Sequence, residues 1–461
     1  MGERVSTYET GVCDIERFSR LLRGRVHAPT ADGRSSLYWN GHAWVHGRPR
    51  LVVHCRGPFD VVEAVRYANA RDVRVAVWTS GEARVHQVPV DDAMVVDLSH
   101  MKRVFVDHRT GTVIAEPGLS GREFEAYAYQ HGLSAPAAMA ADASIADATL
   151  DGEHGWLSRR DGLACDNLHA ANLVTPQGDY LQVDAEHQPD LFWAIRGGGP
   201  NFGIVTSLTY CTRTADEQVF GGSIAYPLAA LRQVVDFYFE ASSQCSDELT
   251  LRLMLADIGG RSVCTLQVLS HLEHEDNALL AAKLRQLAAP LADTLGLMPY
   301  PDFKQAVLVP YKKAIGCAPA PGPFYFEQDW LTPANQATLT EWLERWPAKQ
   351  CVITVEHLGG QISRIPAAAT AFAYRDSPYR LLIGLISREP DDTMAAVRYQ
   401  YGLLTALGAD PLRYAFDEPP GCRAHAWHAY AGNYNRLASI KRIGDPDGRF
   451  VGNGLFDHLY R

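Results

Sequence analysis

The alternation of β-rich runs and a helical pattern across residues 49–98 is the feature that most constrains the fold of this chain. Residues 51–55, 73–78 and 93–98 are short runs rich in β-branched residues, which predicts strands. Between the first two runs, apolar residues recur at helical spacing over residues 60–70. Strands and helices that alternate in this way are typical of an α/β domain.

The pattern changes at about residue 219, which predicts a second domain. Longer strands and charged helices follow, as in an antiparallel sheet with helices on one face. The sequence pattern of the last segment, from residue 429 to 450, resembles that of the first half. Because single cores stop growing at roughly 250–300 residues, a chain of 461 residues divides. We predict one domain of residues 1–213 and 421–461, with residues 214–420 inserted as the other.

Composition excludes several classes of function. The net charge of −10 argues against a nucleic-acid-binding surface and suits a small-molecule substrate. No run approaches the roughly 18 apolar residues of a membrane span, and no apolar region follows the polar start of the chain. The nine cysteines occur singly, as in reduced thiols. We expect a cytoplasmic protein, and the Ala, Arg and Gly bias indicates a bacterial source.

Eight segments match the landmarks of one family in the same order along the chain. They are residues 96–101, 155–159, 162–167, 190–206, 356–366, 370–375, 430–437 and 441–450. With them the sequence resembles the berberine-bridge-enzyme-like flavoproteins. The resemblance implies an α+β (α/β) protein: a two-domain FAD-binding fold of the vanillyl-alcohol-oxidase (PCMH) type, in which the inserted substrate domain is an antiparallel sheet covered by helices.

The first flavin loop departs from the family pattern. In the family this loop reads Arg-Ser-Gly-Gly-His, and its histidine is bonded to the flavin. Here the segment contains Trp78, Thr79, Ser80, Gly81 and Glu82. A carboxylate at position 82 cannot form the histidyl–flavin bond, so the resemblance implies no covalent attachment here.

The second flavin loop, residues 135–155, has lost most of its glycines and gained acids. Gly155 is retained, and no cysteine for a second covalent bond is present. A carboxylate about 4 Å from a phosphate is repelled by roughly 1–4 kcal/mol. We therefore expect a degenerate flavin site and no cofactor, with non-covalent FAD as the alternative. The acids that carry this expectation are Asp142, Asp147, Asp151 and Glu153.

Three residues near the C-terminus are candidate catalytic groups. The resemblance aligns Tyr430 with a tyrosine that reaches over the flavin ring, and Asn433 with its polar neighbour. A phenol is a usable general acid even without a cofactor. His428 falls two residues before Tyr430, on the same side of an extended segment. Packing between the domains is the alternative reading of Tyr430.

A cleft between the domains is expected to bind the substrate. Its lining candidates are Glu82, His86, His154, Tyr325, Trp330 and Tyr374. The aromatic members suit an apolar cavity, although aromatic residues in such places also form cores. We predict no metal site, because acid-rich turns such as residues 151–154 are common without one.

These residues lead to three hypotheses for the function. The first is an enzyme, a flavin-independent cyclase or isomerase of natural-product biosynthesis, whose shaped cleft favours one ring closure on a polyketide-like or related apolar metabolite. The second is an FAD-dependent oxidase that binds FAD non-covalently. The third is a catalytically silent partner subunit of an active flavoprotein relative. A homodimer and a heterodimer with a related protein both stay open.

Overall fold

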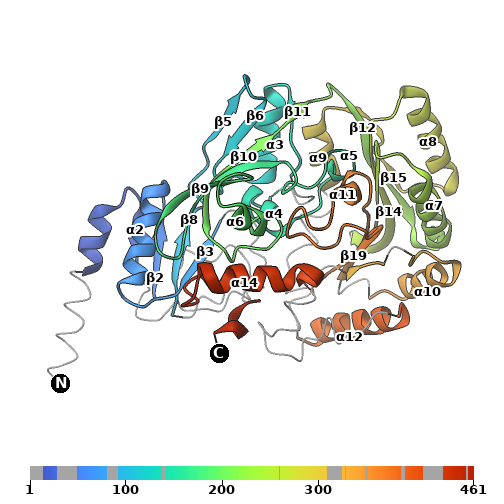
Figure 1. The fold of residues 1–461 in the computed structure, drawn as a ribbon. Helices are drawn as coiled ribbons and strands as arrows, with labels where there is room; N and C mark the ends of the chain where they lie inside the picture. The colour runs from blue at the N-terminus through green and yellow to red at the C-terminus, as the bar shows by residue number, and fades with distance from the viewer. Residues whose placement is uncertain are drawn as a thin grey trace.

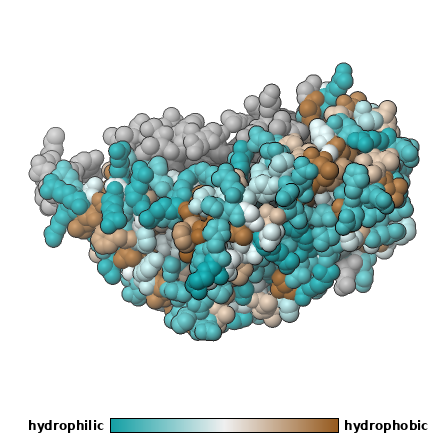
Figure 2. Space-filling model, turned by 90° about the horizontal axis from the view of Figure 1, so that it is seen from above, coloured by the Kyte–Doolittle hydropathy of each residue, from teal (hydrophilic) through white to brown (hydrophobic). Residues whose placement is uncertain are grey.

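The computed structural model describes most of the chain, in twelve segments. They are residues 14–28, 49–79, 92–137, 139, 142–258, 260–308, 324–327, 329–347, 351–385, 390–408, 429–452 and 455–460. Among these residues, no helix has both the length and the apolar character that a bilayer crossing requires. Figure 2 shows that polar residues dominate one face of the molecule and that apolar residues occur there in small separate groups.

The N-terminal sheet is built on three parallel strands, as the alternation predicts. β2 and β3 both pair in parallel with β4, and β1 adds an antiparallel edge. The strands are valine-rich and buried, as parallel strands usually are. Helix α2, which begins at Pro58, packs its apolar face on this sheet. The bounds are β1 Arg25–His27, β2 Leu51–His54, α2 Pro58–Asn69, β3 Val75–Trp78 and β4 Met94–Asp97.

A second, five-stranded antiparallel sheet follows in the order β5-β6-β10-β8-β9. Helix α3 starts at a capping box in which the side chains of Ser120 and Glu123 bond each other's backbone N–H groups. The bounds are β5 Val104–Asp107, β6 Thr112–Ala115, α3 Gly121–Gln130, α4 Ile145–Asp151, α5 Ser158–Asp161, β8 Leu168–Val174, β9 Tyr180–Asp184, α6 Pro189–Ala194 and β10 Ile204–Cys211, with β7 Leu133–Ser134 paired to β11 Arg213–Thr214.

The third sheet is antiparallel and has helices on its outer side (Figure 1). Its order is β15-β12-β14-β13-β18-β19-β17, and β16 also pairs with β12. The bounds are β12 Val219–Pro227, α7 Leu231–Gln244, β13 Leu249–Ile258, β14 Arg261–Ser270, α8 His274–Leu287, β15 Ala292–Asp293, β16 Gly296–Met298, α9 Tyr300–Leu308, β17 Phe324–Tyr325, α10 Pro333–Glu344, β18 Cys351–His357, α11 Gln361–Arg364, β19 Tyr379–Leu385 and α12 Pro390–Ala406.

Side chains alternate across the two faces of this third sheet. Leu251, Leu253 and Leu255 of β13 lie in the core that the sheet shares with α7 and α10. Because successive side chains of a strand point to opposite faces, Arg252 and Met254 lie on the other face. That face is the one on which the polar residues of the candidate site gather.

The C-terminal segment packs against the first half of the chain. Helix α14, Tyr434–Gly444, packs beside α6, and Phe450 forms a parallel bridge with Val75 of β3 (Figure 1). Inside this segment the buried Lys441 ammonium donates to Asp445, Asn201 O and Phe450 O. The predicted domain limits themselves are not tested by these contacts and stay a prediction.

A close backbone contact joins the loop that contains Ala371, between β18 and β19, to the segment that contains Gly197 in the first half of the chain. The backbone N–H of Ala371 donates to Arg196 O at 2.9 Å, so the two segments run in backbone contact. Gly197 adopts φ +100°, and a Cβ there would lie 2.6 Å from the backbone nitrogen of Phe372. A side chain at this position would push the two halves apart.

We expect the Gly197→Ala substitution to lower the free energy of unfolding by about 3 kcal/mol, since it combines a strained φ with an overlap against backbone. The matched control is Gly132→Ala. Gly132 also has a positive φ, +71°, but nothing lies within 4 Å of its Cβ position. Urea denaturation of both variants checks this, and equal losses would contradict the packing role of Gly197.

Candidate functional site

The two segments that correspond to the flavin loops meet in the structure. Thr79 follows β3, and its Oγ1 donates to Asp147 Oδ2 at 2.6 Å. Asp147 lies in the first turn of α4, which the Ser144 side chain caps. Trp78 is half-buried at the end of β3. The expectations for Ser80, Gly81, Glu82 and His86 fall outside the described residues.

The acids of the second loop have local partners. Asp142 is exposed, and Arg122 donates to its Oδ1 at 2.8 Å. Asp147 accepts the Thr79 hydroxyl group, as described above. Asp151 is half-buried at the end of α4, and Glu153 is buried. A guanidinium and a hydroxyl group therefore already engage two of the four carboxylates that we expected to face a phosphate.

The glycines of this loop sit where backbones touch. Gly152 ends α4 with φ +68°, and a Cβ there would lie 2.7 Å from the Phe372 ring. A Cβ at Gly155 would lie 1.8 Å from Ala137 O, so the two ends of the loop are in contact. The loop is thus held against both itself and the segment that contains Phe372.

His154 lies between these glycines and is almost fully buried, with 2% of its surface exposed. Its Nδ1 lies 3.6 Å from Glu356 Oε2 of β18. Among the described residues, neither ring nitrogen has a hydrogen-bond partner. Burial lowers the pKa of His154 to about 4, so the ring is neutral at ordinary pH.

Glu356 is the centre of a polar row that crosses the third sheet. Arg252 of β13 pairs in register with Glu356 of β18, Glu356 with Arg380 of β19, and Arg380 with Tyr325 of β17. Arg380 Nε donates to Glu356, and Arg252 Nε lies 3.2 Å from Glu356 Oε1. Burial opposes ionisation of Glu356, but Arg380 and Arg252 hold the pKa of its carboxyl group well below the usual range.

Aromatic residues occupy the far end of the row. Tyr325 stacks on Tyr374 with ring centroids 4.1 Å apart and planes 4° apart. The Phe372 ring meets Tyr325 edge-on at 6.0 Å. The structure therefore brings together three predicted cleft residues, His154, Tyr325 and Tyr374. It places Trp330 elsewhere, in the helix-covered core and 4.0 Å from the Phe326 ring.

The C-terminal candidates contact two neighbouring segments, Tyr430 the glycine run of residues 197–199 and Asn433 the segment of residues 367–371. Tyr430 is 4% exposed, stacks on Phe456, and donates from its hydroxyl group to Gly198 O at 2.8 Å. Asn433 Nδ2 donates to Ala371 O at 3.2 Å. These contacts give both residues a packing role. Their predicted catalytic role is not tested and stays a prediction, and His428 lies outside the described residues.

Sequence reasoning missed Arg252, Glu356 and Arg380 as a group. Each is the charged residue in an otherwise uncharged and mostly apolar stretch of strand: Leu-Thr-Leu-Arg-Leu-Met-Leu, Cys-Val-Ile-Thr-Val-Glu and Arg-Leu-Leu-Ile. A charge inside a buried strand needs a partner, so these interruptions were the available signal. Only the strand register shows that the three share one face.

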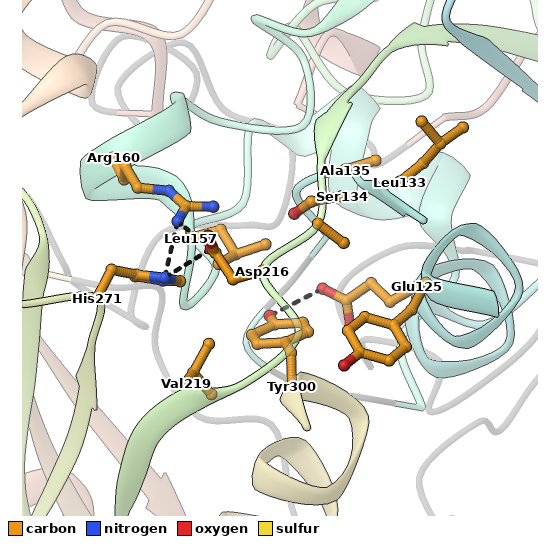
Figure 3. Close-up of a pocket in the computed structure, with 12 residues that line it drawn as sticks. Glu125, Leu133, Ser134, Ala135, Leu157, Arg160, Asp216, Val219, His271 and Tyr300 are labelled. Carbon is orange, nitrogen blue, oxygen red and sulfur yellow. Dashed lines mark hydrogen bonds and ion pairs between the residues drawn. The ribbon is translucent and has the colours of Figure 1, made fainter. Parts of the chain in front are cut away.

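A small pocket lies elsewhere, between the first half of the chain and the third sheet (Figure 3). Arg160 of α5 and Asp216 both reach His271, at 2.7 Å and 2.9 Å from its Nδ1. On the opposite wall the Tyr300 hydroxyl group donates to the buried Glu125 at 3.1 Å, and Lys304 lies 2.9 Å from the same carboxylate. These contacts join α5 and α3 to the third sheet and to α9.

Comparison with known proteins shows what this chain is similar to. Residues 49–184 match the family model described as an FAD binding domain. The chain is 24% identical over 415 residues to an FAD-linked oxidoreductase of Dictyostelium discoideum, covering 88% of each protein. It is 26% identical over 463 residues to aclacinomycin-N/aclacinomycin-A oxidase of Streptomyces galilaeus, covering 87% of this chain and 83% of that one.

The fold matches berberine bridge enzyme from Eschscholzia californica. The TM-score is 0.77 at 16% identity, and the match covers 95% of this chain and 97% of that structure. The resemblance to the berberine-bridge-enzyme-like group and the α+β, PCMH-type fold are therefore confirmed.

Two expectations are wrong: the absence of a cofactor and the flavin-independent cyclase or isomerase. Residues 49–184 match an FAD binding domain, and relatives that span most of the chain are named FAD-linked oxidoreductases and oxidases. The error came from treating every acid of the second loop as facing a phosphate. Arg122 and Thr79 engage Asp142 and Asp147, and a charge that has a local partner repels a ligand less.

We expect the Glu356→Gln substitution to destabilise the protein by about 3–5 kcal/mol, because it removes the counter-charge of two arginines in a buried row. Glu344→Gln is the control, since Glu344 pairs with Arg232 at 3.0 Å on the surface and should contribute less than about 1 kcal/mol. Chemical denaturation at neutral pH measures both losses. Similar losses would show that Glu356 is not a structural counter-ion.

We also expect His154 to make stability depend on pH. The unfolded ring protonates near its ordinary pKa of about 6.5 and the folded ring only at about 4, so the unfolded state binds the proton first on acidification. Stability contributed by His154 is complete above pH 6.5 and falls as the pH drops toward 4, by at most about 3 kcal/mol.

The measurement is the free energy of unfolding between pH 7 and pH 4 for wild type and His154→Gln. The variant should show a shallower slope, whereas a change at the exposed His169, His169→Gln, should leave the slope unchanged. If His154→Gln has the same slope as wild type, then the His154 ring is protonated at a similar pH in the folded and the unfolded protein, and the prediction is wrong.

Proposed function

We propose that this chain is an FAD-linked oxidoreductase that holds FAD without a covalent bond. The observation that carries the proposal is the convergence of the two loop segments within the FAD binding domain, where Thr79 bonds Asp147. The names of the relatives, which span most of the chain, support the same activity.

The residues of the two loops fit a dinucleotide. Thr79 and the segment of residues 144–155 would hold the diphosphate, because backbone N–H groups in small-residue turns suit phosphate oxygens. Asp142 turns its carboxylate to Arg122, and Asp147 turns its carboxylate to Thr79. The carboxylates at these positions are therefore compatible with a bound anion.

Covalent attachment is not available to this chain. The resemblance places Glu82 at the family's histidine position, and residues 135–155 contain no cysteine. Cys165, which follows that loop, is fully buried, and burial raises the pKa of its thiol. A buried neutral thiol is a poor nucleophile. FAD would be held by non-covalent contacts alone.

Bound FAD supplies an acceptor for two electrons from a substrate. The chain's own residues shape the place where a substrate would meet it. His154, Glu356 and Arg380 are all buried, so water is excluded from this part of the polar row. The neutral His154 offers a ring nitrogen that holds no proton at ordinary pH.

The purified protein should show the visible absorption bands of flavin, either directly or after incubation with FAD and desalting. Denaturation followed by ultrafiltration should then release all of the flavin into the filtrate, as expected without a covalent bond. Protein that retains no flavin after incubation and desalting would overturn the proposal, and flavin that stays with the denatured chain would overturn its non-covalent part.

A pair of threonine variants makes this test specific. Thr79→Val removes the hydroxyl group that donates to Asp147 and that orients this carboxylate, so we expect FAD affinity to fall about tenfold or more. Thr110→Val removes an exposed hydroxyl group from the β5–β6 turn and should have no effect. Equal affinities in the two variants would remove Thr79 and Asp147 from the binding site.

A further inference from the structure

One edge of the five-stranded sheet carries exposed apolar side chains. Strand β5 is the outermost strand on one side of this sheet, and in the part of the chain that the structure describes only β6 pairs with it (Figure 1). Phe105 of β5 is 61% exposed, and Ile114, its register partner on β6, is 38% exposed. Val106 and Val113 point to the opposite face and are buried in the core that the sheet shares with α3. Phe105 and Ile114 therefore form an apolar strip on the outer face, at the edge of the sheet.

The backbone of β5 has hydrogen-bonding groups that point to this edge. Glu116 N donates to Arg103 O at 2.9 Å, which makes Arg103 and Glu116 a hydrogen-bonded pair of the ladder. Hydrogen-bonded and non-hydrogen-bonded pairs alternate along antiparallel strands, so the N–H and C=O groups of Val104 and Val106 point away from β6. Proteins usually protect such an edge with lysine, proline or a bulge, and residues 104–106 have none of these.

This edge is complementary to a second copy of itself. If two β5 strands pair antiparallel about a twofold axis through Phe105, Val104 of each copy lies opposite Val106 of the other. The outward N–H and C=O groups of both strands then meet. The two Phe105 side chains lie directly opposite each other at the axis, on the face that carries the apolar strip.

Charge favours the same register. Positions 103 and 107 flank the axis, so Arg103 of each copy lies opposite Asp107 of the other. The Arg103 side chain is 77% exposed and the Asp107 side chain 31%. Arg103 Nε donates to Glu116, which leaves other N–H groups of the guanidinium for a second carboxylate. An axis through Val106 would instead place Arg103 opposite Arg109, two like charges.

We propose that this protein forms a homodimer in which the two β5 strands pair antiparallel about Phe105, so that two sheets become one continuous sheet. Ile114 of each copy lies beside the central pair of phenylalanine rings and extends the apolar contact. Because a twofold contact uses the same surface on both copies, association stops at the dimer. The dimer does not depend on FAD binding or on the proposed oxidoreductase function.

Sedimentation velocity of the purified wild-type protein at several concentrations tests the dimer. Two short strands form a small contact, so we expect a monomer–dimer equilibrium with a dissociation constant on the order of 10 μM. Phe105→Glu removes the apolar contact and places two carboxylates at the axis, which should raise this constant at least about 100-fold. Phe59→Glu is the matched control, at a phenylalanine that is 54% exposed on α2, and should dimerise as wild type does.

Two results of this experiment would overturn the proposal. One is a wild-type protein that is still monomeric at about 200 μM. The other is a dimer that Phe105→Glu and Phe59→Glu weaken equally. Circular dichroism and thermal unfolding of both variants show whether each is folded as wild type is.

Charge reversal tests the register. Arg103→Asp and Asp107→Arg should each weaken dimerisation roughly tenfold, because each places like charges opposite one another across the axis. The double variant restores opposite charges there and should dimerise more tightly than either single variant. Within one copy the two positions are about 13 Å apart along the strand, so this recovery cannot come from a contact inside one chain. A double variant as weak as the single variants would contradict this register.

A cysteine at the axis gives an independent test. Facing Cα atoms in a non-hydrogen-bonded antiparallel pair are about 4.5 Å apart, which a disulfide can span. Phe105→Cys should therefore form a covalent dimer under mild oxidation, whereas Ile114→Cys, one strand further from the axis, should not. Wild type measures any dimer formed through native cysteines such as the exposed Cys211. Equal cross-linking of the two cysteine variants on a non-reducing gel would overturn the proposed pairing.

Discussion

One buried carboxylate determines how the parts of this site are held. Glu356 lies between the guanidinium groups of Arg252 and Arg380, and His154 approaches it from the other half of the chain. Taking charges out of water is costly, so such a group is stable only where its partners are fixed. The strand register supplies these partners at neighbouring positions, which ties the loop before Gly155 to the face of the third sheet.

The second constraint is the lack of room for a side chain where the first half of the chain touches the segment that contains Phe372. Phe372 occupies space that a Cβ at Gly152 or Gly197 would need. Its ring also meets the Tyr325–Tyr374 stack edge-on. Phe372 therefore contacts both the glycine-containing loops and the aromatic pair, so the packing of one depends on the packing of the other. Tyr430 supports the glycine side of this contact through Gly198 O, and Asn433 supports the Phe372 side through Ala371 O.

Local patterns predicted the fold because its signals lie within single segments. The strands after residue 49 and the β5–β6 hairpin show periodicities that a short window reveals. The site is different. Glu356 lies 104 positions from Arg252, and only the pairing of β13 with β18 makes them neighbours. His154, Tyr325 and Tyr374 could be selected by residue type, but their grouping around a buried row follows from register, which the sequence does not state locally.

The cofactor expectation failed for a related reason: residue types were counted without their partners. An acid in a phosphate-binding loop disfavours the phosphate only if its charge points there and has no nearer neighbour. Arg122 comes from α3 and Thr79 from the end of β3, so each acid finds its partner outside its own loop. A loop can exchange glycines for acids and remain compatible with an anion when the surrounding elements supply donors to those acids. The loss of a motif therefore shows that the contacts have changed, whereas loss of the ligand depends on where the new charges point.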